Sequence, residues 1–189
     1  MKKGQPERKE PEYKRNGTQC LIASRSVNTG KIDAFTIGNS RTEKDFLEHI
    51  QNIALTNLNA RHVIICDQLN THKSASLVEW IASIENQAEL LGVKGKSGIL
   101  SNMATRKEYL EREEHKISFQ YTPKHCSWLN QIENWFGLLV RKVLKRGSFN
   151  STEELKNKII EFIEYYNLYY AKPYKWKKSA KDILNKFKT

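Results

Sequence analysis

Residues 62–74 read HVIICDQLNTHKS, and the first half of this stretch decides the fold. His62 to Cys66 is a short, continuous run that is rich in β-branched side chains. Such a run is typical of a strand that is buried on both faces of a sheet. Asp67 follows at once, so the sequence predicts a carboxylate at the carboxyl end of an interior strand.

The segments on both sides of this strand alternate between strand and helix patterns. Upstream, the turn residues Asn28-Thr29-Gly30 join two strand patterns and predict a hairpin. Thr42 and Asp45 have the spacing of a helix-capping pair. We expect strands at about 18–26, 31–37 and 116–121, and helices at about 42–56, 74–84 and 105–113. This order predicts an α/β layered domain.

The remainder of the chain is mostly helical in pattern. At about 100° per residue, a helix over residues 127–145 gathers its apolar side chains on one stripe and places Glu133 at the edge of that stripe. Considered alone, this pattern favours an amphipathic core helix with a boundary glutamate. A further helix is predicted to begin at the capping box that opens with Ser151.

Length and composition bound the organisation of the chain. Its 189 residues, 39% of them hydrophobic, suffice for one domain with its own core. Residues 1–16 are predicted to be a charged tail or linker, and residues 17–189 the domain, with an insertion at about 85–116. No apolar run is long enough to span a membrane, and the start of the chain has no signal-peptide pattern. We therefore expect a cytoplasmic protein without membrane partners.

The charge balance indicates an anionic partner. The 32 Lys and Arg residues outnumber the 21 Asp and Glu residues, which gives a net charge of +11. Such an excess attracts polyanions because phosphate contacts release condensed counterions. DNA or RNA is the first class of partner to consider, and a protein that merely has a basic surface is the alternative.

Asp67 and Glu133 are the candidate catalytic residues. A carboxylate that ends a buried strand and another on a later helix can converge in space, and their mutual repulsion then requires a proton or a cation. Oxygen ligands favour hard ions such as Mg²⁺ or Mn²⁺. Two such ions would suit attack on a phosphodiester. The three cysteines form no C-x-x-C pair, so a zinc site is not favoured.

Four stretches of the chain carry a more specific signal, namely PEYKRNGT (11–18), HVIICDQLNTHKS (62–74), YTPKHCSWLNQIENWFGLLVRKVLKRGSF (121–149) and KPYKWKKSAKDIL (172–184). The most specific feature is a strand that ends at Pro123 and leads into a helix with the motif WLNQIEN. Together these stretches resemble the catalytic domain of DDE transposases from bacterial insertion sequences of the mariner-related superfamily. It implies a ribonuclease-H-like mixed sheet flanked by helices. It also implies two Mg²⁺ or Mn²⁺ ions, held by three acids, that cleave DNA strands and transfer them to a target.

Carried over by position, Asp67 would be the second acid and Glu133 the third, both as metal ligands. The first acid belongs to an opening, central strand that has no counterpart here, since Asp33 and Asp45 occupy positions where the family has no ligand. We therefore expect an N-terminally truncated or split transposase with impaired activity. The alternative is a non-catalytic DNA-binding remnant that regulates an intact transposase.

The resemblance also suggests partners and further site residues. It implies transposon-end and target DNA, a homodimer or a pairing with an intact transposase, and a place at the bacterial nucleoid. Asn70, His72 and Asn130 are candidate auxiliary residues, although a capping Asn and a surface His explain the first two equally well. The candidate DNA contacts are Lys94, Lys96, Lys124, Arg141, Lys142, Lys145 and Arg146.

Overall fold

The structure is a computed structural model, and it describes residues 15–87, 91–124, 126, 129–145 and 147–175. It confirms a mixed α/β domain. The strands are β1 (Cys20–Arg25), β2 (Ile32–Gly38), β3 (His62–Cys66) and β4 (Ile117–Tyr121). The helices are α1 (Glu43–Thr56), α2 (Ala75–Ile84), α3 (Met103–Leu110), α4 (Gln131–Leu139) and α5 (Thr152–Tyr169), with 3₁₀ turns at Asn70–Lys73 and Ile99–Ser101 and a π-helical turn at Val140–Leu144.

The predicted hairpin is present. β1 pairs antiparallel with β2, from Cys20 opposite Gly38 to Arg25 opposite Ile32, with a bulge beside Ser24. Gly30 closes the turn at a φ of 76°, a conformation that glycine adopts without strain. The expected cap of α1 is also formed, because Thr42 and Asp45 make a reciprocal capping box.

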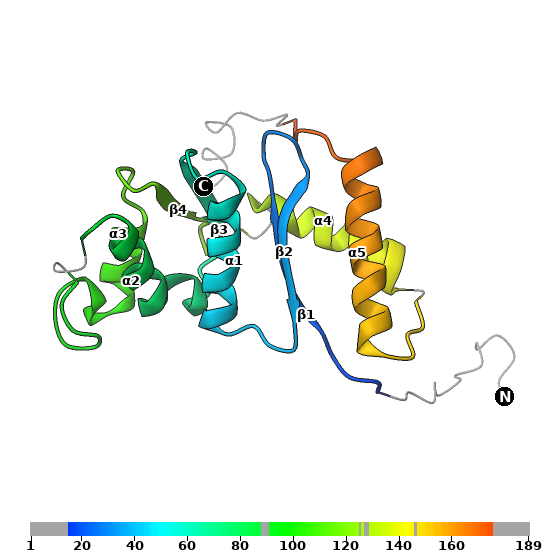
Figure 1. Cartoon of the computed structure of the whole chain (residues 1–189), viewed down its shortest axis with the longest axis horizontal. Coiled ribbons are helices and arrows are strands. Elements are labelled where there is room, and N and C mark those ends of the chain that lie inside the picture. The colour runs from blue at the N-terminus through cyan, green and yellow to red at the C-terminus, as the bar shows by residue number, and fades with distance from the viewer. Residues whose placement is uncertain (1–14, 88–90, 125, 127–128, 146, 176–189) are drawn as a thin grey trace, which may run out of the picture.

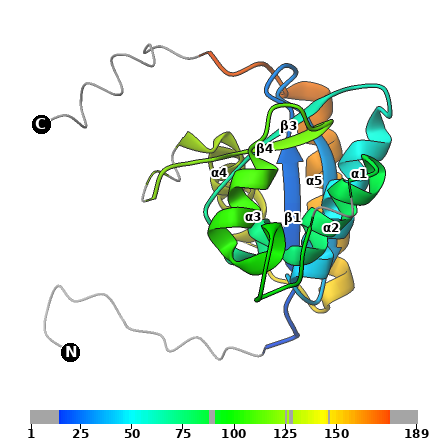
Figure 2. The ribbon, with the colours of Figure 1, turned by 90° about the vertical axis from the view of Figure 1, so that its left-hand side faces the viewer.

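β3 and β4 are parallel neighbours, paired from His62 with Ile117 to Cys66 with Tyr121. Figure 2 shows these two strands side by side. Their carboxyl ends therefore meet at one edge, where Asp67 follows β3. The four strands form two separate two-stranded sheets, so the single mixed ribonuclease-H-like sheet that we expected is not formed by the residues that the structure describes.

The prediction that β3 is buried on both faces is wrong. Cys66 is buried and Ile64 packs against the core, but Val63 and Ile65 on the other face are 54% and 48% exposed. A run of β-branched residues indicates that a strand is suited to burial on both faces. Actual burial depends on whether other strands and helices cover both faces. Among the described elements, none covers this second face of β3.

Two hydrophobic clusters hold the domain together. The first joins α1, α2, α3, β3 and β4, and the second joins the hairpin to α4 and α5. Figure 1 shows the hairpin between α1 and α5. Residues 85–116, which we predicted as an insertion, add four buried side chains to the first cluster: Leu91, Leu100, Tyr109 and Leu110.

The long helix that we predicted over residues 127–145 is shorter and less regular. α4 begins at Gln131, residues 127 and 128 lie outside the described part, and the last turns widen into a π-helix from Val140. A π-helix turns less per residue, so later positions rotate away from the stripe drawn at a constant helical angle. Val140, one of the apolar residues of the predicted stripe, is 46% exposed, whereas Trp135, which precedes the π-helical turn, is 2% exposed.

Candidate metal and DNA site

Asp67 lies where the carboxyl ends of β3 and β4 meet, and its carboxylate is held from one side. Its Oδ1 accepts the backbone N–H of Leu69 at 3.0 Å and lies 2.8 Å from Nδ1 of His72. Oδ2 has no hydrogen-bond partner among the residues that the structure describes, and the side chain is 49% exposed. One carboxylate oxygen is thus fixed while the other remains available to a ligand.

His72 is positioned by its surroundings. Its ring packs on Phe46 with a centroid distance of 4.2 Å, and its backbone carbonyl accepts the Tyr121 hydroxyl at 2.7 Å. Burial lowers the pKa of His72, and the nearby Asp67 carboxylate opposes this only in part. The neutral imidazole therefore carries its proton on Nδ1, where it donates to Asp67. The sequence marked His72 as a candidate auxiliary residue, and the structure places its ring against the Asp67 carboxylate.

Lys73 is a residue that sequence reasoning missed. It is buried, its Nζ donates to Oε1 of Gln68 at 3.2 Å, and Nζ lies 5.7 Å from the centre of the Tyr121 ring. Gln68 in turn donates to the carbonyl of Thr122 at 3.0 Å. These contacts tie the loop after β3 to the end of β4 and hold a buried lysine between them. One lysine in a polar loop gives no sequence signal for such burial.

Glu133, which the helix pattern places at the edge of the apolar stripe, lies in the first turn of α4 and is exposed. Its carboxylate makes no hydrogen bond or ion pair with the other described residues. Asn130 caps the same helix, with Oδ1 accepting the N–H of Ile132 at 3.4 Å, which is the structural role expected of such a residue. Asn70 is exposed at the start of the 3₁₀ turn that leads to His72.

The predicted DNA-contacting cations are exposed wherever the structure describes them. Lys94 and Lys96 belong to the loop before α3, Lys124 follows β4, and Arg146 lies outside the described residues. The remaining three, Arg141, Lys142 and Lys145, are grouped at the π-helical turn and just beyond it.

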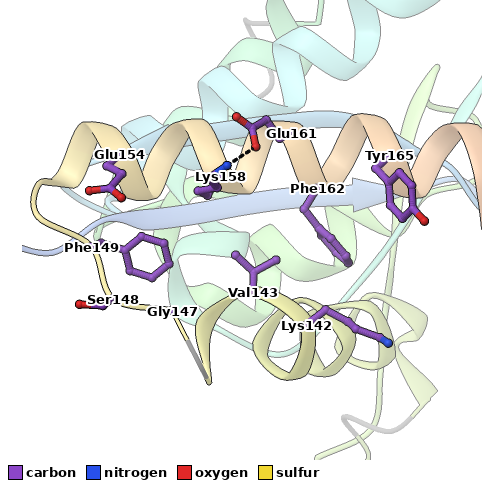
Figure 3. A pocket seen from close by; sticks show the side chains of 10 residues that line it. All are labelled: Lys142, Val143, Gly147, Ser148, Phe149, Glu154, Lys158, Glu161, Phe162 and Tyr165. Carbon is purple, nitrogen blue, oxygen red and sulfur yellow. Dashed lines mark hydrogen bonds and ion pairs between the residues drawn. The ribbon is translucent and has the colours of Figure 1, made fainter.

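Lys142 also borders a groove of about 610 Å³ between this turn and α5. Figure 3 shows Val143, Phe149 and Phe162 between the two helices. Lys158 is paired with Glu161 at 2.7 Å, and the lining holds two lysines and two glutamates, Glu154 being the second. Its charges balance, so this groove does not favour phosphate.

The ligand set for a divalent ion is incomplete in this structure. Asp67 offers one free oxygen of the kind that Mg²⁺ prefers. However, no group of three or more His, Cys, Asp or Glu side chains comes together among the described residues. The donor chemistry fits a hard cation, and the number of donors does not fit a site that binds two ions.

Comparison with known proteins identifies a family over most of the chain. The model of a family described as DDE superfamily endonuclease matches residues 1–156. No curated protein and no solved structure matches the chain. In the part of the chain that the structure describes, no helix is both long and apolar enough to cross a membrane.

Proposed function

The chain belongs to the DDE superfamily of endonucleases, and we propose that it is a transposase catalytic domain of the insertion-sequence, mariner-related kind. Its substrate is transposon-end and target DNA, and its chemistry is cleavage of a phosphodiester followed by strand transfer. The observation that carries this proposal is the geometry of Asp67. Its carboxylate ends a parallel strand, is held on Oδ1 by two donors and keeps Oδ2 free.

In this proposal Asp67 and Glu133 hold divalent ions, either Mg²⁺ or Mn²⁺. Bound ions would supply a nucleophile at neutral pH and stabilise the leaving oxygen. The protein's own groups have simpler tasks. His72 fixes the rotamer of Asp67, the buried Lys73 holds the loop after β3 against the end of β4, and the exposed cations near the end of α4 hold the DNA backbone.

We further propose that the chain by itself is impaired. A two-ion site needs more carboxylate ligands than Asp67 and Glu133 provide. The alternative function, a DNA-binding regulator that acts on or pairs with an intact transposase, is supported by the same incomplete ligand set together with the net charge of +11.

The decisive experiment is a nicking assay on supercoiled plasmid DNA with Mg²⁺ or Mn²⁺. We expect slow nicking that is abolished by Asp67→Asn and by Glu133→Gln, with DNA affinity largely retained. Glu164→Gln is the matched control, since Glu164 is an exposed acid on α5. Nicking that survives both site substitutions would overturn the proposal, and DNA binding without any nicking would establish the regulator instead.

A further inference from the structure

The hydroxyl of Tyr121 reaches the loop that carries the candidate metal ligand. Tyr121 is the last residue of β4 and pairs with Cys66, the residue before Asp67. Its hydroxyl donates to the backbone carbonyl of His72 at 2.7 Å, 49 positions earlier in the chain. Burial raises the pKa of this phenol, so the hydroxyl keeps its proton at neutral pH and remains a donor. The end of β4 is thus bonded to the turn that follows β3.

The backbone of His72 is fixed on both sides of its side chain. Its N–H donates to the carbonyl of Leu69 at 3.0 Å, and its carbonyl accepts the Tyr121 hydroxyl. From this backbone the ring brings Nδ1 to within 2.8 Å of Oδ1 of Asp67. A hydrogen bond weakens steeply when its donor is displaced or turned, so a shift of the His72 backbone would loosen the contact with the carboxylate. The Tyr121 hydroxyl is therefore placed to control this contact.

Two ammonium groups lie beside the ring of Tyr121. Nζ of Lys73 is 5.7 Å from the ring centre and Nζ of Lys107 is 5.6 Å from it, and both distances are within the range of a cation–π contact. Lys73 belongs to the loop after β3, whereas Lys107 belongs to α3, in the segment 85–116 that we predicted as an insertion. The ring is therefore contacted both from the loop and from the insertion.

Lys107 is itself held in place. Its ammonium pairs with Glu111 at 2.6 Å, one helical turn later, and both side chains are partly buried. The helix is anchored by the buried Tyr109 and Leu110 and lies against the 3₁₀ turn Asn70–Lys73. An ammonium that an ion pair already fixes loses less rotamer freedom in contacting a ring than a free lysine does.

We propose that Tyr121 is a positioning residue for Asp67, acting through His72, and that Lys107 supports it from the insertion. The segment 85–116 thereby shapes the candidate metal site, in addition to its packing in the first hydrophobic cluster. The consequence for metal binding rests on the proposed function, whereas the effect on the His72 ring does not. The alternative is that Tyr121 and Lys107 only stabilise the fold.

Imidazole nitrogen NMR of the full chain, at neutral pH and without metal, tests the first step. In the native chain we expect His72 to hold its proton on Nδ1, because that nitrogen donates to Asp67. Tyr121→Phe removes only the hydroxyl, and we expect the ring then to populate both tautomers. Tyr109→Phe is the matched control, because its hydroxyl bonds Gln87 in the same cluster. A native chain with mixed tautomers, an unchanged tautomer in Tyr121→Phe or an equal change in the control would overturn the proposal.

Mn²⁺ affinity, measured by electron paramagnetic resonance, tests whether Tyr121 acts through His72. Residues that orient a metal ligand contribute about 10–100-fold, and Tyr121 is one step further from the ion, so we expect Tyr121→Phe to weaken binding about threefold to tenfold. In a His72→Phe background the same substitution should have no further effect, because residues that act through one another are not additive. Equal losses in the two backgrounds would show a merely structural role.

Asp67→Asn separates this proposal from the proposed function. If Mn²⁺ affinity is the same in this variant as in the native chain, Asp67 holds no ion and the metal site of the proposed function fails. The tautomer of His72 in Tyr121→Phe then still decides whether Tyr121 positions the ring against Asp67.

Two substitutions of Lys107 test the contribution of the insertion. Lys107→Met keeps an unbranched side chain and loses the charge, whereas Lys107→Arg keeps a cation for the ring. We expect the Met variant to change the His72 tautomer in the same direction as Tyr121→Phe and the Arg variant to retain the native tautomer. Arg112→Met, which removes a cation 5.1 Å from the Tyr109 ring, is the control and should have no effect. A native tautomer in Lys107→Met would overturn the part assigned to Lys107.

Discussion

Nδ1 of His72 lies 2.8 Å from Oδ1 of Asp67, and that single oxygen also accepts the N–H of Leu69. The two donors leave Oδ2 as the free atom of the carboxylate. His72 lies five positions after Asp67 in the chain, and the 3₁₀ turn Asn70–Lys73 brings its ring back over the end of β3. His72 therefore acts as a positioning residue for a proposed ligand, and this role can be separated from its packing on Phe46.

Two substitutions of His72 make that separation. His72→Phe keeps a ring against Phe46 and loses the donor, whereas His72→Asn keeps a donor and loses the ring. Partners that orient a metal ligand typically contribute 10–100-fold in affinity. We expect Mn²⁺ binding, measured by electron paramagnetic resonance, to fall by about tenfold or more in the Phe variant and less in the Asn variant. His62→Phe, which alters a histidine away from Asp67, should have no effect, and the reverse order of the two His72 variants would contradict a positioning role.

The sequence predicted those elements whose signals are local. The hairpin and α1 were recognisable because Asn28-Thr29-Gly30 and the Thr42 and Asp45 pair act within a few residues of chain. The exposure of Val63 was not predictable in this way, since it depends on which strands and helices lie around β3. Pattern reasoning also assumes a constant helical turn, and the π-helix from Val140 breaks that assumption.

In the candidate site, too, the sequence predicted only the features that depend on neighbouring residues in the chain. Asp67 was placed correctly at the end of β3, because a run of β-branched residues followed by an acid is a local pattern. The burial of Lys73 and its contact with Tyr121 join segments that are far apart in the chain, and no spacing reveals them. Glu133 was expected at the edge of the apolar stripe, and its exposed position in the first turn of α4 is compatible with that placement.

DNA binding should depend on salt and on the cations near the end of α4. Each phosphate contact contributes roughly 0.9 to the slope of log affinity against log salt. For a double variant, Arg141→Gln with Lys145→Gln, we therefore expect the slope measured by fluorescence anisotropy to fall by about 1.8. The double variant Lys156→Gln with Lys158→Gln is the control, because both lysines are already paired with glutamates on α5. A larger loss in the control would place the DNA on α5.

His49 makes stability depend on pH. It is 1% exposed, lies between the hydroxyls of Ser24 and Thr36, and burial lowers its pKa to about 4 from 6.5. The unfolded chain thus binds a proton at His49 more readily than the folded chain does. Its contribution to stability is complete above pH 6.5 and is lost as the pH falls toward 4, to a total of about 3 kcal/mol.

Urea unfolding at pH 7, 5.5 and 4.5 checks this prediction. His49→Gln should flatten the decline in the free energy of unfolding between these values. Some decline should remain, because the pKa of His72 is also lowered by burial and acts in the same direction. A curve that stays as steep in the variant as in the native chain would show that the acid sensitivity arises elsewhere.

Asn167 closes the outer edge of the hairpin, and its removal should cost stability and solubility together. Ile32 is 3% exposed, so Asn167→Ala leaves its N–H and its carbonyl buried without partners, at a cost of about 2–3 kcal/mol in urea unfolding. Asn157→Ala, at an exposed position on the same helix, should cost less than about 0.5 kcal/mol. A freed strand edge also pairs with other chains, so light scattering of the Asn167 variant should rise with concentration. Light scattering that stays constant with concentration, in a variant that remains folded, would contradict this role of Asn167.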